Sequence, residues 1–365
     1  MADAMPGPRD EIVRLDAYSW ETPTWEIARR YGLRVEDVVR MDLNTSPYNP
    51  SRWLHRLVGG IEGVRVNEYP DTSYRELREM LSSYTGVEPE SIMVCNGADE
   101  AIDIVCKAYL DGGREAIISS PTYSYFRVSA EIMGSKVVSI PRLPDFADNI
   151  EGILASVNSR TSLIFLCSPN NPTGNTVDRM AVRKILDEFD GVVVIDEAYF
   201  EFCGETFTPL LSRYGNLVVV RTFSKAWSMA GARVGYLMAG EEVMKYLNKV
   251  RPPNSLSIIS LALAAYALRD KRTMEGYVRR IVDERDRMYK ELSNIEGLTV
   301  YRSKANFLLI RFHRADAGRV HEELMRDGLV LRRLTNIPAL SNCLRMTIST
   351  PKYNNLLLRK IRKLV

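Results

Sequence analysis

Lys225 has an unusual setting for a lysine, in the segment TFSKAWSMAGAR at residues 222–233. It comes soon after the apolar run LVVV, which is typical of a buried strand, and Arg233 follows it by eight residues. Hydroxyl groups at Thr222 and Ser224 precede the lysine. Hydroxyls and a guanidinium are suitable donors to an anion such as a phosphate, and the lysine adds an amine. The segment therefore predicts an anion site with an amine beside it.

A second set of donors is predicted where the apolar run SIMVC is followed by NGADEA. Gly97 would permit another group to approach closely, and the first turn of a helix would present the free N–H groups of Ala98 and Asp99 to an anion. An ordinary capped helix start would have the same sequence. In the lysine segment, Gly231 would let the backbone turn sharply before Arg233. Both glycines are therefore predicted to shape an anion site.

Asp196 ends a further apolar run, GVVVID, and is predicted to be partly buried. A buried carboxylate is costly without a cation beside it, and either an arginine or a protonated ring nitrogen would satisfy it. Tyr199 and Asn171, the latter in SPNNPTG, could donate hydrogen bonds to a phenolic oxygen. Tyr123 in PTY could stack on an aromatic ring. A plain turn at NNPTG and core packing of Tyr123 would explain the same residues equally well.

One ligand would use all of these groups together. It has a phosphate, a flat ring with a basic nitrogen, a phenolic oxygen and an aldehyde that can react with Lys225. Pyridoxal 5′-phosphate is that molecule, with the lysine forming a Schiff base and Asp196 keeping the ring nitrogen protonated. The sequence therefore predicts pyridoxal 5′-phosphate as the cofactor.

The elements that must position these residues follow a regular order from about residue 91. Continuous apolar runs such as EAIISS, SLIFLC and GVVVID alternate with helical patterns. This order predicts an α/β fold in which a mostly parallel sheet is covered by helices on both faces. Ligands of such sheets bind at the C-terminal ends of the strands, which is where the polar residues named above lie.

The pattern changes at about residue 270. A long charged helix leads to the short strands NFLLIRF and CLRMTIS, with helices at 315–327 and 352–364. These elements are typical of a smaller α+β unit. We therefore expect an N-terminal segment or lid at 1–40 that joins the small domain, a large cofactor-binding domain at 41–270 and a small domain at 271–365.

Composition excludes several classes of protein. The 49 basic and 46 acidic residues give a formal charge of +3, which is too balanced to favour nucleic acid or an anionic membrane as a partner. The N-terminus lacks the apolar stretch of a signal peptide, and SLSIISLALAAYAL is short for a membrane span and predicts a buried helix. The five cysteines and three histidines show no metal-ligand spacing. We expect reduced cysteines, no metal and a cytoplasmic protein.

The ordered set GADEA, PTY, SPNNPTG, DEAY, SKA and GAR resembles the motifs of the fold-type I, class I/II pyridoxal-phosphate aminotransferases. The similarity runs from about residue 40 to the C-terminus. Within that family the chain is most similar to the histidinol-phosphate aminotransferases, on YPD at 69–71, DEAYFEF and the tail LRRLTNIPALSNCLRMTIST. The resemblance implies the large and small domains of fold type I and a homodimer.

The resemblance also implies a role for each site residue. Catalysis would involve Lys225, Asp196 and Tyr199. The cofactor would be bound by Ala98, Asp99, Tyr123, Asn171, Asp196, Tyr199, Thr222, Ser224, Lys225 and Arg233, together with the partner subunit's Tyr69. The substrate would be bound by Arg345, Arg332, Asn171 and Tyr18.

The resemblance predicts transamination between L-histidinol phosphate and 2-oxoglutarate, a step of histidine biosynthesis. The chain departs from the family near its start, where DLNTSPYNPS replaces NENPYG and no PY-x-PG lid is found, and at Asn342, where NCLR replaces GCLR. Threonine-phosphate decarboxylase and an aromatic or broad-specificity aminotransferase are the alternative enzymes. A non-catalytic effector domain of a transcription regulator is a further alternative, but no helix-turn-helix pattern precedes the enzyme-like region.

Overall fold

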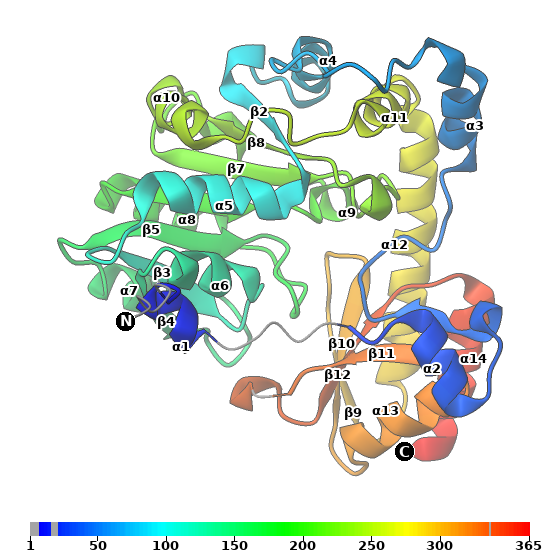
Figure 1. The fold of residues 1–365 in the computed structure, drawn as a ribbon. Helices are drawn as coiled ribbons and strands as arrows, with labels where there is room; N and C mark the ends of the chain where they lie inside the picture. The colour runs from blue at the N-terminus through cyan, green and yellow to red at the C-terminus, as the bar shows by residue number, and fades with distance from the viewer. Residues whose placement is uncertain (1–6, 16–20, 336) are drawn as a thin grey trace, which may run out of the picture.

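The computed structural model describes residues 7–15, 21–335 and 337–365, and these contain two β-sheets (Figure 1). The larger sheet has the strand order β2-β8-β7-β6-β5-β3-β4. Its strands are β2 (Ile92–Cys95), β3 (Glu115–Ser120), β4 (Lys136–Pro141), β5 (Thr161–Cys167), β6 (Val192–Asp196), β7 (Leu217–Thr222) and β8 (Gly235–Ala239). β8 pairs antiparallel with both β2 and β7, and the other pairings are parallel. The predicted mostly parallel sheet is confirmed.

Helices cover both faces of this sheet, as predicted (Figure 1). In β6, Val193 and Ile195 belong to one hydrophobic core, whereas Val192 and Val194 belong to a second one. The first core includes residues of helices α4 (Arg75–Thr85) and α8 (Arg179–Glu188). The second includes residues of α5 (Gly97–Tyr109), α6 (Tyr125–Ile132) and α10 (Glu241–Val250). A strand that is buried on both faces must be apolar at every position, which explains the continuous apolar runs in the sequence.

The helices of the described chain are as follows. They are α1 (Asp10–Arg14), α2 (Thr24–Tyr31), α3 (Ser51–Gly59), α4 (Arg75–Thr85), α5 (Gly97–Tyr109), α6 (Tyr125–Ile132), α7 (Ile150–Ala155), α8 (Arg179–Glu188), α9 (Phe200–Cys203), α10 (Glu241–Val250), α11 (Ile258–Arg269), α12 (Lys271–Ser293), α13 (Ala317–Arg326) and α14 (Pro351–Leu364). Short 3₁₀ turns lie at η1 (Val35–Asp37), η2 (Ile61–Gly63), η3 (Pro89–Ser91), η4 (Thr208–Leu210), η5 (Ala230–Ala232) and η6 (Pro338–Leu340).

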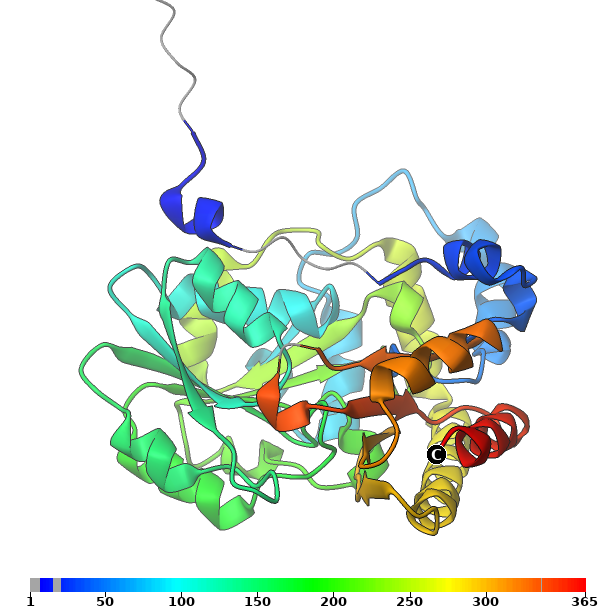
Figure 2. The ribbon, with the colours of Figure 1, turned by 90° about the horizontal axis from the view of Figure 1, so that it is seen from below.

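The smaller sheet has the order β1-β11-β12-β10-β9. Its strands are β1 (Val39–Met41), β9 (Leu298–Tyr301), β10 (Phe307–Phe312), β11 (Leu329–Arg333) and β12 (Cys343–Thr347). The predicted strands NFLLIRF and CLRMTIS are β10 and β12, and the predicted helices are α12, α13 and α14. Figure 2 shows α12 and α14 side by side next to this sheet.

The start of the chain reaches both units. α1 contacts α6 of the larger unit, whereas α2 contacts α13 of the smaller one. β1 pairs with β11 and so adds residues 39–41 to the C-terminal sheet. Strand β1 therefore crosses the predicted boundary at residue 40. The division at 1–40, 41–270 and 271–365 stays a prediction.

Two further expectations concern membranes and cysteines. Within the described ranges, no helix has both the length and the apolar character needed to cross a membrane. The stretch SLSIISLALAAYAL forms most of α11, where Leu263, Ala264, Ala265 and Ala267 are buried. All five cysteines are free, and four of them are buried.

Candidate active site

The donors predicted for an anion converge where α5 begins and β7 ends. The Thr222 hydroxyl donates to Ser224 Oγ at 3.0 Å, and the backbone N–H of Ser224 donates to Thr222 Oγ1 at 3.1 Å. Arg233 Nη1 lies 3.5 Å from Ser224 Oγ, and its Nη2 lies 3.1 Å from Asp99 Oδ2. These groups therefore form one cup. It consists of the end of β7, the guanidinium of Arg233 and the start of α5 at Gly97–Asp99.

Gly97 is required by this cup. Its φ is +84°, and a Cβ at this position would lie 2.7 Å from Arg233 Nη2. A larger residue would therefore be strained and would displace the guanidinium. The predicted close approach at Gly97 is confirmed.

Gly231 lies in the 3₁₀ turn η5, so the backbone does turn there, but the turn does not use the conformational freedom of glycine. The left-handed backbone conformations in this segment belong to Ser228 (φ 57°) and Arg233 (φ 53°), whereas Gly231 has no positive φ. The backbone of Arg233 is strained, and its guanidinium is held by polar contacts with Ser224 and Asp99. The left-handed conformation is therefore adopted at the functional side chain itself, at a conformational cost that the rest of the fold must offset.

Asp196 is the last residue of β6 and is 3% exposed. Its Oδ1 accepts a hydrogen bond from the N–H of Ala198 at 2.9 Å. Burial raises the pKa of this carboxyl group from its ordinary 3.8 to about 7, against the lowering effects of the Ala198 N–H and the charge of Lys225. A cation placed against Asp196 would remove this cost, so the site is suited to a positively charged ring nitrogen.

Lys225 is half-buried in the same region. Its Nζ donates to the carbonyl oxygen of Leu43 at 3.2 Å and is 5.8 Å from the centroid of the Tyr199 ring. Burial, followed by the charge of Arg345, lowers the lysine pKa from 10.5 to about 8. A larger share of the amine is therefore neutral near neutral pH than for an exposed lysine, which makes it a better nucleophile and base.

Tyr123 is also brought to the cup. Its hydroxyl donates to Asp99 Oδ1 at 2.8 Å, so Asp99 is held by both Tyr123 and Arg233. Burial, with the charge of Asp99, raises the pKa of the Tyr123 hydroxyl, which stays protonated as a donor.

A second arginine, Arg345 on β12, connects the smaller sheet to the loop after β5. Its Nη1 donates to Asn171 Oδ1 at 2.5 Å, and its Nη2 donates to the carbonyl oxygen of Asp42. Arg345 is 7% exposed, and burial lowers the pKa of its guanidinium to about 10. Among the described residues its Nε is buried without a hydrogen-bond partner. A buried guanidinium with an unused donor indicates a place for an anionic ligand.

Arg332 on β11 lies directly opposite Arg345 in the antiparallel pairing of the two strands. Its Nη1 is 3.1 Å from Glu21 Oε1, with side-chain exposures of 38% and 31% for the two partners. The structure therefore brings both predicted substrate arginines to one face of the smaller sheet.

Tyr69 is not brought to these groups. Tyr69 lies between η2 and α4, with 85% of its surface exposed. Its predicted role concerns the neighbouring subunit and stays a prediction. Tyr18 lies outside the described residues.

Sequence reasoning missed Asn44. Its Nδ2 donates to the hydroxyl of Tyr199 at 2.9 Å, and its backbone oxygen accepts from Asn306 at 3.0 Å. The same short segment supplies the carbonyl of Leu43 to the lysine and that of Asp42 to Arg345. The available signal was DLNTSPY, polar residues that directly follow a strand at the place where the family has NENPYG.

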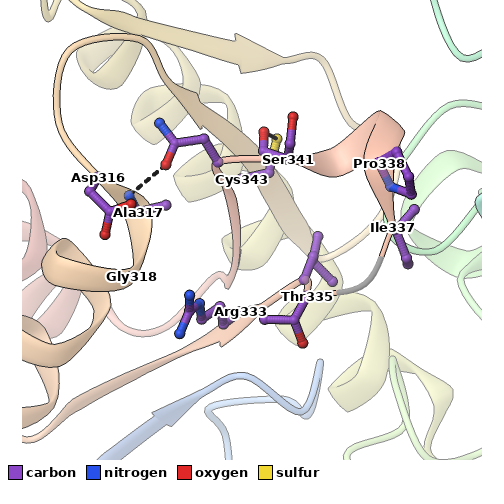
Figure 3. A pocket seen from close by; sticks show the side chains of 11 residues that line it. Asp316, Ala317, Gly318, Arg333, Thr335, Ile337, Pro338, Ser341 and Cys343 are labelled. Atoms are coloured by element: carbon purple, nitrogen blue, oxygen red, sulfur yellow. Dashed lines mark hydrogen bonds between the residues drawn. The ribbon is translucent and has the colours of Figure 1, made fainter.

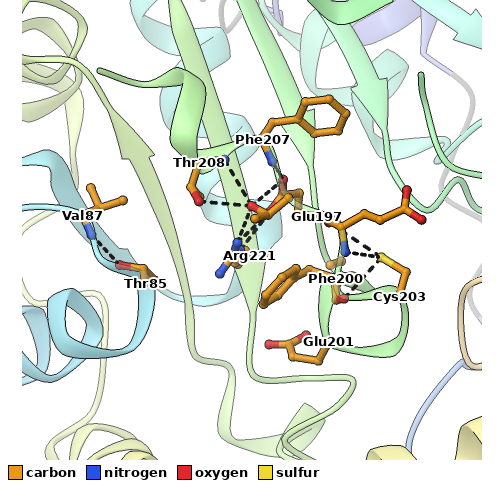
Figure 4. Close-up of polar contacts among 12 residues, drawn as sticks. Thr85, Val87, Glu197, Phe200, Glu201, Cys203, Phe207, Thr208 and Arg221 are labelled. Carbon is orange, nitrogen blue, oxygen red and sulfur yellow. Dashed lines mark hydrogen bonds and ion pairs between the residues drawn. The ribbon is translucent and has the colours of Figure 1, made fainter. Parts of the chain in front are cut away.

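Glu197 and Arg221 form a buried ion pair next to the site residues (Figure 4). Glu197 is 0% exposed and is 2.9 Å from Arg221, whose guanidinium lies 3.6 Å over the Phe200 ring. Glu197 also accepts from the backbone N–H of Phe207. Glu197 and Arg221 are chain neighbours of Asp196 and Thr222, so this pair helps to fix the ends of β6 and β7 that carry the functional side chains.

A separate pocket lies beside the N-terminus of α13 (Figure 3). Its lining includes Arg333, Thr335, Ser341 and Asn342, and none of the predicted site residues. In the described part of the chain, no group of three or more His, Cys, Asp or Glu side chains could hold a metal ion.

The residues present fit pyridoxal 5′-phosphate. The cup at Thr222, Ser224 and Arg233 offers hydroxyls and a guanidinium to a phosphate. The buried carboxylate of Asp196 suits a protonated ring nitrogen, and the amine with lowered pKa at Lys225 suits the aldehyde. The fit rests on the orphaned charge of Asp196 and on the space that Gly97 leaves for Arg233.

Comparisons with known proteins agree with this reading. Residues 36–361 match the family described as aminotransferase class I and II. A histidinol-phosphate aminotransferase of Caldanaerobacter subterraneus subsp. tengcongensis is 36% identical over 328 residues, which cover 89% of this chain and 93% of that protein.

Solved structures share the fold. A histidinol-phosphate aminotransferase of Sinorhizobium meliloti, in complex with pyridoxal-5′-phosphate, has a TM-score of 0.86 at 24% identity and covers 100% of both chains. An L-threonine-O-3-phosphate decarboxylase of Porphyromonas gingivalis has a TM-score of 0.79 at 22% identity, covering 89% of this chain and 98% of that one. The fold is therefore common to both reactions.

Proposed function

The chain belongs to the class I and II aminotransferases, and on that premise we propose that it transfers an amino group between L-histidinol phosphate and 2-oxoglutarate. The observation that carries this proposal is the pair of guanidiniums on neighbouring strands, Arg332 and the buried Arg345. A phosphorylated amine and a dicarboxylate both need such anion-binding groups close to Lys225.

Pyridoxal 5′-phosphate supplies the electron sink that stabilises negative charge at the substrate carbon when it is bound. Its phosphate would be held by Thr222, Ser224 and Arg233 with the N–H groups of Ala98 and Asp99. Asp196 would pair with the ring nitrogen. Tyr199 and Asn171 would hold the phenolic oxygen, and Tyr123 would stack on the ring.

Lys225 would move the proton in this reaction. Its pKa is lowered to about 8, so the neutral amine can accept a proton from the substrate carbon and return it. Tyr199 and the carbonyl oxygen of Leu43 lie beside its Nζ and limit the positions that the amine can take. These neighbours would hold the base close to the reacting carbon of a bound substrate.

Arg345 would bind the anionic group next to the reacting carbon. Histidinol phosphate has a phosphoester there in place of the α-carboxylate of glutamate, so one arginine would have to accept both groups. Arg332, opposite Arg345, would add a second positive charge for the phosphoester dianion.

The enzyme is proposed to act as a homodimer in the cytoplasm. An exposed apolar set supports the dimer, because residues on α3 and the chain after it are 37–85% exposed. The set consists of Leu54, Val58, Ile61, Val66 and Tyr69. Tyr69 would then reach the phosphate cup of the partner subunit. The cytoplasmic location is supported by five cysteines that form no disulfide.

The proposal is tested by comparing specificity constants for amino donors in single half-reactions. L-histidinol phosphate should give the highest value, with phenylalanine and tyrosine slower. Release of carbon dioxide from phosphothreonine would instead identify a decarboxylase. A faster reaction with an aromatic amino acid would also contradict the proposed substrate, while leaving the cofactor residues in place.

A further inference from the structure

Glu21 forms an ion pair with Arg332, one of the two proposed substrate-binding arginines. Its Oε1 is 3.1 Å from Arg332 Nη1, and the two side chains are 31% and 38% exposed. The contact joins residues that are 311 positions apart in the chain, so the fold places this carboxylate over the guanidinium.

The segment that carries Glu21 is anchored by a different arginine. Arg40 Nη1 donates to the carbonyl oxygen of Thr22 at 3.1 Å and to Thr24 Oγ1 at 3.2 Å. The charge of Arg40 is balanced by Asp42, which accepts from its Nε and Nη2 at 2.8 and 2.7 Å. Arg40 therefore holds the backbone beside Glu21 and has its own carboxylate partner.

Arg345 differs from both of these arginines. Its hydrogen bonds go to the neutral oxygens of Asn171 and of the Asp42 backbone. Burial and then the charge of Arg332 lower its pKa, while Tyr199, Asp42 and Glu21 act in the opposite direction. Glu21 is thus felt by Arg345 as well as by Arg332.

The charges of the region around Arg40, Arg332 and Arg345, here called the corner, can be counted from these contacts. Arg40 with Asp42 is neutral, and so is Arg332 with Glu21, which leaves the single positive charge of Arg345. If Glu21 leaves Arg332, the corner has two uncompensated positive charges. The first state matches a carboxylate monoanion, and the second matches a phosphoester dianion.

We propose that Glu21 is a specificity-determining residue, an internal counter-ion that stays on Arg332 when a carboxylate binds at Arg345 and is displaced when a phosphomonoester dianion binds. The inference rests on the proposed function, because it requires that Arg332 and Arg345 face the substrate. It explains how one pair of arginines serves two substrates whose anionic groups differ in charge.

Displacement of Glu21 is feasible because the ion pair is partly exposed. Pairs of this kind contribute little to stability, since water can replace each partner. A dianion that contacts both guanidiniums can therefore compete for Arg332, whereas a monoanion held by Arg345 has less to gain.

The test uses the cofactor-loaded protein and two ligands without an amino group, propyl phosphate at pH 8 and butyrate. Dissociation constants are measured by calorimetry for the unmodified protein and for Glu21→Gln. Propyl phosphate should bind Glu21→Gln about 3- to 10-fold more tightly, and butyrate should change less than about 2-fold. Glu26→Gln is the matched control, because Glu26 pairs with Arg30 on α2 and should leave both constants unchanged.

Arg332→Gln completes a double-mutant cycle. Glu21→Gln should have no effect in the Arg332→Gln background, because the competition has been removed. An equal gain for both ligands, or a gain that persists without Arg332, would overturn the inference. Neither ligand is turned over, so these results are independent of whether histidinol phosphate is the substrate.

Discussion

Replacement of Asp196 by asparagine should make the cofactor-free protein more stable and the loaded enzyme much slower. The carboxyl group is 3% exposed, and burial raises its pKa from 3.8 to about 7. A rise of about three in pKa corresponds to about 4 kcal/mol, because a change of one in pKa is worth about 1.4 kcal/mol. This is an upper bound on what the buried charge costs when no cation lies against it. Asparagine keeps the acceptor for the N–H of Ala198 and removes the charge.

The pH dependence follows from the direction of the shift. Because the native pKa is higher than the unfolded pKa, the native protein binds more protons between about pH 4 and pH 7. Relative to Asp196→Asn, the unmodified protein therefore loses stability as the pH rises through this window. Below about pH 4 the two should differ little, and at pH 8 the variant should be more stable by as much as about 4 kcal/mol.

Urea unfolding of the two cofactor-free proteins at pH 4 and pH 8 measures this difference. Other buried carboxyls titrate in both proteins, so the difference between them isolates Asp196. In the loaded enzyme, loss of one buried charge-assisted contact of about 2–4 kcal/mol should slow turnover ~30- to 1000-fold. Equal stability of the two proteins at pH 8, together with a near-native rate, would refute the reasoning.

Three further outcomes are expected. Capture of pyridoxal 5′-phosphate by the cofactor-free protein should speed up as the pH rises through about 8, because burial and Arg345 lower the pKa of Lys225; a rise only near pH 10 would contradict this. Mixing inactive Tyr69→Ala and Lys225→Ala subunits should restore activity, because one site of each hybrid dimer is intact; verified hybrids without activity would show that the sites are self-contained. Stopped-flow measurement of Arg332→Ala should show that transition-state stabilisation falls by on the order of 1–3 kcal/mol in the histidinol-phosphate half-reaction and by less with glutamate. Equal losses in the two half-reactions would argue against a special role of Arg332 in phosphate binding.

The sequence predicted the site best where its residues follow strands of the larger sheet. Asp196, Thr222 and the start of α5 lie at the ends of continuous apolar runs, and a parallel sheet brings such ends to one edge. Both the strand run and its polar end can be recognised locally, so no long-range contact had to be known.

Contacts between distant segments could not be predicted in the same way. Asn44 bonds to Tyr199 only because β1 joins β11 in the C-terminal sheet, and a three-residue strand gives almost no pattern. Likewise β4 has a mostly half-buried or exposed surface, so KVVSIP lacked the continuous apolar character of its neighbours. The register that sets Arg332 opposite Arg345 is a tertiary property of the same kind.

The turn before Arg233 shows a different limit. Glycine is the usual residue for a sharp turn, which favoured Gly231, but the left-handed residues are Ser228 and Arg233. Strain at a functional side chain breaks the local rule because the surrounding contacts hold it in place. Such exceptions occur where function takes precedence over local preference.

The most direct test of the central claim is to identify the residue that carries the cofactor. Reduction of the loaded protein with borohydride would fix pyridoxal 5′-phosphate on its lysine, and trypsin would then release the labelled peptide. A label on Lys225 would block cleavage there, so residues 222–233 should appear as one intact labelled peptide between Arg221 and the cleavage after Arg233. A label on any other lysine, or no covalent label, would contradict the account.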